Sequence, residues 1–180
     1  MAERIDDECL VKQFSQGDDS AFDGIVKRYS ADIAVLVNRL LGWPGDVEDV
    51  VQDIFLAVFI GLKKFRCECS LKSWLFTITI NKCRTYRYKQ LLWHRKTFHK
   101  LSPSRSADGE LLDKETFNRV HFAVKALPAK YREPVVLRYL QELSINESSR
   151  ILGISENTLQ VRLNRARERL RRELAKLIEE

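Results

Sequence analysis

Apolar side chains recur every three or four positions along most of the chain, and this spacing is typical of helices with one buried face. The period is clearest over 21–41. Gly42 and Pro44 then end this helix, because glycine suits the turn after a helix and proline cannot continue it. A second helix is predicted from Asp46, a good capping residue, to about 62.

The same period returns twice more, with a break between the two stretches. After a loop over 63–70, a third helix is predicted from 71 or 72 to about 93. Residues 94–115 lose the period, and 102–109 read SPSRSADG, a composition typical of a flexible linker. Helices over 117–127 and 129–140 are then expected, with Pro128 between them.

The strongest local signal is a pair of helices joined by a glycine turn. Ser144 and Glu147 have the spacing of a capping box, Gly153 suits a left-handed turn, Ile154 is an apolar plug, and Ser155 caps a long helix. The apolar stripe of that long helix is Leu159, Leu163, Ala166 and Leu170. This pattern predicts a helix-turn-helix, whose second helix enters the DNA major groove, although a plain pair of packed helices is the alternative.

The expected fold is all-α, because seven glycines and four prolines in 180 residues are few for a turn-rich β protein. We expect two small helical domains, 1–93 and 116–180, joined by a flexible linker over 94–115. Two cores of this size are each only modestly stable, so a large partner is expected.

Charge is segregated along the chain, although the net charge is only +6. Residues 1–62 carry 5 basic and 12 acidic side chains, whereas 63–105 carry 12 basic and 1 acidic. Residues 155–176 are again basic. Basic blocks attract phosphate backbones, and the acidic block indicates a second partner with a basic surface.

Two predicted helices carry candidate binding surfaces. In the second, four polar residues lie off the apolar stripe without balancing lysines, which favours a docking surface over an ordinary solvated face: Glu48, Asp49, Gln52 and Asp53. The third helix mixes cations with Tyr86, Tyr88 and Trp93, which suits unstacked bases. Core aromatics beside a solvated cationic face are an equally good interpretation of that helix.

Other classes of function have little support. No stretch approaches the roughly 20 apolar residues of a membrane span, and the acidic start is unlike a signal peptide, so we expect a cytoplasmic protein with reduced thiols. A metal-dependent nuclease or a thiol enzyme would have to be built from Cys67, Cys69, Cys83 and His94, whose spacing matches no common zinc motif. We expect no metal, no cofactor and no enzymatic activity.

Three segments resemble the extracytoplasmic-function (ECF) sigma factors of RNA polymerase, in that family's order and with its linker between them. They are DVEDVVQDIF at 46–55, FRCECSLKSWL at 65–75 followed by Ile78 and Asn81, and ALPAKYRE at 126–133 continuing through LGISENT at 152–158 to Leu170. The resemblance covers about 8–174 apart from the linker.

The resemblance implies an alternative sigma factor that gives core polymerase its promoter specificity. Its partners would be the β′ clamp helices and β flap of polymerase, −35 duplex DNA, and the −10 strand, from which a base is flipped. The family also implies an anti-sigma protein, often membrane-anchored, while the sigma factor itself does not insert into the membrane. A stand-alone helix-turn-helix repressor is the alternative, but it would leave the acidic helix unexplained.

The resemblance also assigns residues to each partner. The residues assigned to polymerase binding are Glu48, Asp49, Gln52 and Asp53. The residues assigned to −10 DNA are Arg66, Cys67, Glu68, Cys69, Ser70, Lys72, Asn81, Arg84, Thr85 and Tyr88. The flipped base is expected near the loop 66–71. The residues assigned to −35 DNA are Ser155, Glu156, Asn157, Thr158, Gln160, Val161, Arg162, Asn164 and Arg165.

Several residues depart from the family pattern. Cys67 stands where glycine is common, and Thr85 where an acidic residue is frequent, so −10 preference cannot be carried over. Gln160 and Val161 replace a lysine and a small polar residue, and they suit adenine and a thymine methyl respectively. Ser148 is polar where the helix before the turn normally buries an apolar side chain, so we expect a slightly loosened helix.

Overall fold

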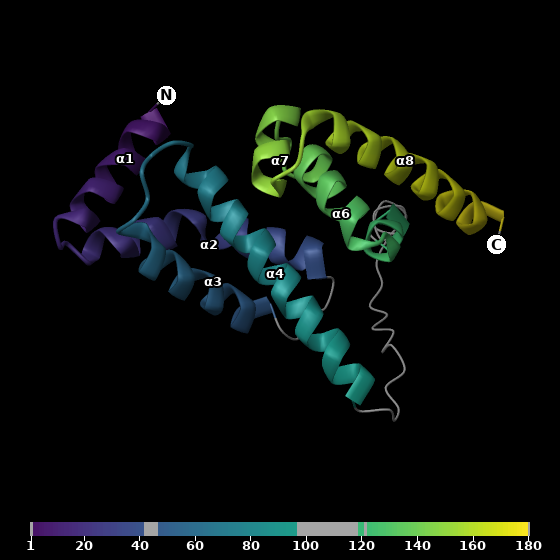
Figure 1. Ribbon diagram of the computed structural model, residues 1–180, viewed down its shortest axis with the longest axis horizontal. Helices are drawn as coiled ribbons and strands as arrows, with labels where there is room; N and C mark the ends of the chain where they lie inside the picture. The colour runs from purple at the N-terminus through teal and green to yellow at the C-terminus, as the bar shows by residue number, and fades with distance from the viewer. Residues whose placement is uncertain (1, 42–46, 97–118, 121, 180) are drawn as a thin grey trace.

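The structure is a computed structural model, and it describes residues 2–41, 47–96, 119–120 and 122–179 (Figure 1). Every regular element in these ranges is helical, which confirms the predicted all-α fold. The elements are α1 (Ala2–Ser15), α2 (Ser20–Leu41), α3 (Val47–Leu62), α4 (Leu71–Lys96), α6 (Ala129–Val135), η1 (Val136–Leu140), α7 (Ile145–Leu152) and α8 (Glu156–Glu179). Residues 122–126 are also helical.

The first four helices form the N-terminal unit, with α2 and α4 packed against α3 (Figure 1). The three helices predicted in this unit are confirmed as α2, α3 and α4, although α4 extends beyond its predicted end. Their predicted stripes are buried, for example Ile25, Ile54 and Leu75, each with no exposed surface. Asp46, Gly42 and Pro44, which were expected to cap and end helices, lie outside the described residues.

Helix α1 was not predicted, because its first half is charged and only a few apolar residues follow. It is held by contacts with distant residues. Phe14 is 1% exposed in the core, and the buried Asp7 accepts hydrogen bonds from Arg28 Nη1 at 2.8 Å and Tyr29 Oη at 2.6 Å. These partners lie more than 20 residues away, beyond the reach of a helical period.

The helix-turn-helix of the C-terminal unit has the predicted local structure. Ser144 caps α7 in a complete capping box with Glu147, and Gly153 adopts the left-handed φ of 67°. Ser155 Oγ accepts a hydrogen bond from Thr158 N at 3.2 Å at the start of α8. The predicted stripe of α8 packs into the core, with Leu159 fully buried.

Two predicted boundaries were wrong. The single helix expected over 129–140 becomes a π-helix from Val136, and Gln141 N donates to Val136 O at 2.9 Å. Pro134, one turn inside α6, has no N–H to donate to the Lys130 carbonyl. The regular series of backbone hydrogen bonds in the helix is therefore already interrupted there. Helix α4 also continues to Lys96, because nothing at Trp93 breaks a helix. The rest of the expected linker lies outside the described residues.

The two units contact each other directly. Buried apolar residues of both belong to one core cluster, whereas two separate cores were expected. Figure 1 shows α7 and α6 lying beside α4. The buried guanidinium of Arg132 donates to the Leu40 carbonyl at the end of α2 at 2.6 Å. Burial lowers the pKa of Arg132 to about 10, so it still carries its charge at neutral pH.

Candidate nucleic-acid and partner interfaces

Helix α3 presents an exposed acidic surface. Its apolar side is buried through Val50, Ile54 and Val58, and the predicted polar residues all lie on the exposed side: Glu48, Asp49, Gln52 and Asp53. Val50, Ile54 and Val58 are each at most 3% exposed and anchor the helix in the core, so the polar residues on its other side form a fixed surface. The last turn of α3 contains no basic residue.

Two apolar residues that sequence reasoning missed continue this surface. Leu56 is 59% exposed and Ile60 is 67% exposed, and they follow Asp49 and Asp53 at spacings of three and four residues. Such spacing places all four on one helix face. The exposed face of α3 is therefore acidic in its first half and apolar in its second half. The signal was available, because both residues lie outside the main apolar stripe.

The loop between α3 and α4 has a fixed conformation. The rings of Phe65 and Trp74 lie 4.9 Å apart, and Gly61 leaves room for Trp74, since an added Cβ would approach its ring at 3.1 Å. Ser70 Oγ accepts from Ser73 N at 3.2 Å at the start of α4. Cys67 has a left-handed φ of 57°, which explains physically why glycine suits this position.

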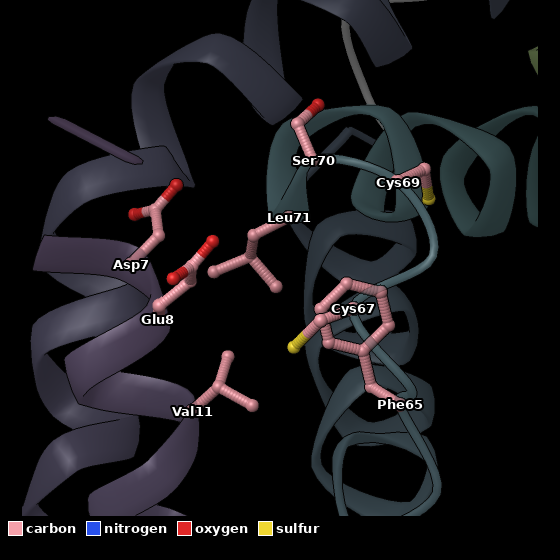
Figure 2. Close-up of a pocket in the computed structure, with 8 residues that line it drawn as sticks. All are labelled: Asp7, Glu8, Val11, Phe65, Cys67, Cys69, Ser70 and Leu71. Carbon is pink, nitrogen blue, oxygen red and sulfur yellow. The ribbon is translucent and has the colours of Figure 1, made fainter. Parts of the chain in front are cut away.

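A small cavity lies between this loop and α1 (Figure 2). It is lined by Asp7, Glu8, Val11, Phe65, Cys67, Cys69, Ser70 and Leu71. The cavity has about 20 Å³ of water-accessible space, enough for about one water molecule. It is too small for a nucleobase in this conformation, so the place of the flipped base stays a prediction.

The cysteines of the loop do not face each other. Figure 2 shows Cys67 Sγ directed towards α1, while Cys69 Sγ lies on the opposite side of the loop backbone. Burial, with a smaller effect of Glu68, raises the pKa of Cys69, and burial raises the pKa of Cys83 to about 12. Both groups are therefore protonated thiols at neutral pH. Among the residues that the structure describes, no group of histidines, cysteines and carboxylates is arranged to hold a metal ion.

Helix α4 carries the remaining −10 candidates. Asn81, Thr85 and Tyr88 are exposed, whereas two cations already have carboxylate partners. Lys72 Nζ lies 3.2 Å from Asp32 Oδ2, and Arg84 binds Glu133 of α6 through both carboxylate oxygens. These hydrogen bonds raise the pKa of Arg84. Arg66, Cys67, Glu68 and Ser70 are exposed on the loop.

Helix α8 exposes nearly all the −35 candidates in its first turns. Arg162 is half-buried, and the others are exposed: Ser155, Glu156, Asn157, Thr158, Gln160, Val161, Asn164 and Arg165. Some of them are oriented by neighbours. Glu156 Oε1 accepts from Asn146 Nδ2 at 2.8 Å, and Asn164 Oδ1 accepts from Arg167 Nη2. The side chains that remain available to a ligand include Asn157, Gln160 and Val161.

One aromatic residue supports the cations of this unit and was missed by sequence reasoning. The Tyr131 ring is buried beneath α8, and the Lys130 ammonium and the Arg169 guanidinium carbon each lie 5.0 Å from its centre. Cations at this distance from an aromatic face are stabilised by its electron density. The contact extends the basic surface of α8 past its first turns.

Within the described ranges, no helix combines the length and the apolar character that crossing a membrane requires.

Comparison with protein families gives two matches in chain order. Residues 25–91 match sigma-70 region 2, and residues 117–170 match sigma-70 region 4. The ECF RNA polymerase sigma-E factor of Escherichia coli K12 is 30% identical over 99% of both chains. The ECF sigma factor SigW of Bacillus subtilis is 32% identical over 93% of this chain and 96% of its own.

Solved structures agree with this relationship. CnrH, solved in complex with the cytosolic domain of CnrY, is 28% identical, covers 95% of this chain and 98% of its own, and has a TM-score of 0.71. The sigma factor RpoE from Bartonella quintana, solved with the anti-sigma factor NepR, shares the fold with a TM-score of 0.68 at 24% identity, covering 86% of this chain and 96% of its own.

The chain carries both sigma-70 regions, and a stand-alone repressor would not contain region 2. The sigma factor is therefore the better interpretation of the two. The relatives match over nearly the whole chain at 30% identity or more. The chain belongs to the ECF sigma factors, and it is an alternative sigma factor that directs promoter-specific transcription by RNA polymerase.

Proposed function

We propose that this sigma factor divides its contacts among three surfaces. The acidic face of α3 binds core polymerase, the loop 63–70 and the adjoining face of α4 bind the −10 strand, and the first turns of α8 bind −35 duplex DNA. The helix-turn-helix supports this division most strongly: Leu159 and Leu163 are buried, while nearly every polar residue between and around them is exposed. A major-groove helix needs this arrangement.

The polymerase contact follows from charge and exposure. The β′ clamp helices are the partner that the family implies for the acidic face of α3. Leu56 and Ile60 extend that face with apolar surface, so the contact combines charge pairing in the first half of α3 with apolar packing in the second. Such a combination is typical of interfaces with a desolvated centre.

The −10 contact combines cations with exposed aromatic and polar side chains on α4. Tyr88 is 63% exposed and offers a ring to an unstacked base, while Arg84 offers a guanidinium to the backbone. The sigma factor supplies only recognition and strand capture in this scheme, and polymerase carries out the chemistry. An anti-sigma protein, membrane-anchored or not, would regulate it in the cytoplasm by covering these surfaces.

Run-off transcription from a promoter library with purified core polymerase tests the proposal. We expect a −35 and a −10 motif among the transcribed promoters, with a spacing that holds both DNA contacts at once. A matched reaction with Leu159→Asp, which disrupts the buried side of α8, should lose selection at −35. Transcription that needs neither motif, or none above core polymerase alone, would contradict the proposed division of contacts.

A further inference from the structure

A hydrogen bond between side chains joins the two helices of the helix-turn-helix. Asn146 lies in the first turn of α7 and donates from Nδ2 to Glu156 Oε1 at 2.8 Å, and Glu156 is the first residue of α8. Both residues are exposed. The bond therefore lies at the protein surface, at the end of α8 whose residues contact base edges in this motif.

The donor Asn146 is itself held in place. The capping box begins α7 at Ser144, and the Asn146 carbonyl accepts a hydrogen bond from Ser149 Oγ at 2.8 Å. Across the turn, Ile154 N donates to the Ser149 carbonyl at 3.1 Å, which ties the start of α8 to α7. Asn146 therefore holds one oxygen of Glu156 at a fixed place relative to α7.

Glu156 differs from its neighbours in the first turn of α8. The hydroxyls of Ser155 and Thr158 lie 2.8 Å apart and form the helix cap, so they are engaged within α8. Glu156 uses one oxygen for Asn146 and leaves Oε2 without a hydrogen-bond partner among the residues that the structure describes. Asn146 is neutral, so this bond does not offset the negative charge of the carboxylate as an arginine partner would. A charged acceptor is thus held at the start of α8.

A fixed carboxylate at this place discriminates between bases by what they can donate. Cytosine presents its N4 amino group in the major groove, and a carboxylate accepts from it. Guanine presents two acceptors there and thymine presents an acceptor and a methyl group, while the adenine amino group lies beside the N7 acceptor, which repels a carboxylate. Phosphates also repel the carboxylate, in every sequence alike. Glu156 should therefore weaken binding in general and favour cytosine.

We propose that Glu156 reads a cytosine of the −35 element through Oε2, and that Asn146 is the positioning residue that holds the carboxylate for this contact. The inference rests on the proposed binding of −35 DNA by α8, and it names the base that this part of the site selects. Without Asn146 the side chain would turn away from the phosphates into solvent. The hydrogen bond removes this freedom before DNA binds.

Run-off transcription by the reconstituted holoenzyme on a matched promoter set tests this. The set keeps the −10 element and spacer of one active promoter and replaces each −35 base pair by the other three. With wild type, we expect one −35 position at which cytosine is favoured by about 5–100-fold over the other bases. Glu156→Ala should lose this preference and keep the preferences at the other −35 positions. It should transcribe the promoters without that cytosine at least as well as wild type does, because the repulsion from phosphates is removed.

Glu168→Ala is the matched control. It removes the same charge at an exposed position of α8, about three turns beyond Glu156. The wild-type preference for cytosine should remain in this variant. The comparison separates reading of a base from a general loss of negative charge.

A second variant tests the positioning role. Asn146→Ala keeps Glu156 and removes the hydrogen bond that holds it, so the cytosine preference should fall at the same base pair and at no other. In the Glu156→Ala background the same change should have no further effect on base preference, because a positioning residue acts only through the group that it holds. A bond that merely held α7 against α8 would instead lower transcription from the whole promoter set alike.

The outcomes separate this inference from the proposed function. A wild type that selects −35 bases, with the same profile in Glu156→Ala or a uniform loss over the set, would overturn the reading of cytosine and leave −35 binding by α8 standing. A wild type without any −35 preference would overturn both. Thermal unfolding checks that each variant folds; should Glu156→Ala fail to fold, an unchanged cytosine preference in Asn146→Ala would overturn the proposal. Loss of the preference in both variants, but not in Glu168→Ala, is the expected result.

Discussion

Ser144 and Glu147 hold each other at the start of α7. Glu147 N donates to Ser144 Oγ at 3.1 Å, and Glu147 Oε2 accepts from Ser144 N at 2.9 Å. Hydrogen bonds from the Ser144 side chain and backbone lower the pKa of Glu147. The pair fixes the helix that supports the recognition helix α8.

This relationship predicts a pH-dependent cap. Ser144→Ala should lower the free energy of unfolding by about 1 kcal/mol at pH 7. Because the folded pKa of Glu147 is depressed, its stabilising effect is present above its unfolded pKa and is lost as pH falls through the folded value. The difference between wild type and variant should therefore shrink below pH 4.5, as measured by urea unfolding. A difference that is independent of pH would mean that the Glu147 carboxylate adds nothing to the cap.

Reversing charge on α3 tests the polymerase surface. Asp49→Arg with Asp53→Arg should leave folding intact, since both residues are exposed, and should weaken core-polymerase binding by at least tenfold. Asp19→Arg with Asp23→Arg makes the same charge change at exposed positions before and within α2 and serves as the control. Unchanged affinity of the α3 variant in a titration with core enzyme would remove α3 from the interface.

The exposed positions of α8 predict two different defects. Gln160→Ala should relax preference at one base pair of the −35 element, at a cost of about 1–3 kcal/mol for the preferred base. Arg165→Ala should weaken binding to all sequences alike and lower the slope of affinity against salt concentration. Affinity measured for a set of −35 variants at several salt concentrations distinguishes the two. An equal loss on every sequence for Gln160→Ala would show that the register of α8 on DNA is different.

The left-handed backbone at Cys67 predicts a stabilising substitution. Glycine adopts this conformation without steric cost, so Cys67→Gly should stabilise the fold by about 0.5–1 kcal/mol. Cys69→Gly is the control, because Cys69 has no positive φ and glycine there should only add freedom to the unfolded chain. Thermal unfolding measures both, and a destabilised Cys67→Gly variant would mean that the thiol side chain contributes to packing.

Ser148 and Ser149 form a matched pair inside α7. Ser148 Oγ is fully buried and has no hydrogen-bond partner among the described residues, whereas Ser149 Oγ donates to Asn146 O at 2.8 Å. Ser148→Ala should therefore raise the free energy of unfolding by about 1–2 kcal/mol, because it removes an unsatisfied polar group. Ser149→Ala should give no such gain. Chemical unfolding of the two variants would refute this account if they shifted equally.

Local signals were sufficient for most of the helices and for the helix-turn-helix. The capping box at Ser144, the glycine turn at Gly153 and the stripe through Leu159 depend on residues within four positions of one another. Such interactions form wherever those residues occur together, so periodicity and capping chemistry predict them well. The exposed acidic face of α3 followed from the same reasoning, because burial of one side of a helix exposes the other.

Tertiary structure alone decided the remaining features. Helix α1 depends on Asp7 meeting Arg28 and Tyr29, and the contact between the two units depends on Arg84 meeting Glu133, 49 residues away. A single sequence carries no local mark of such pairs, since any exposed arginine and glutamate would look the same. The amino-acid sequence by itself therefore determined most of the helices and which polar side chains they expose, because both depend on near neighbours. How the two units contact each other was decided only by the tertiary structure, because packing brings together residues that are far apart in the chain.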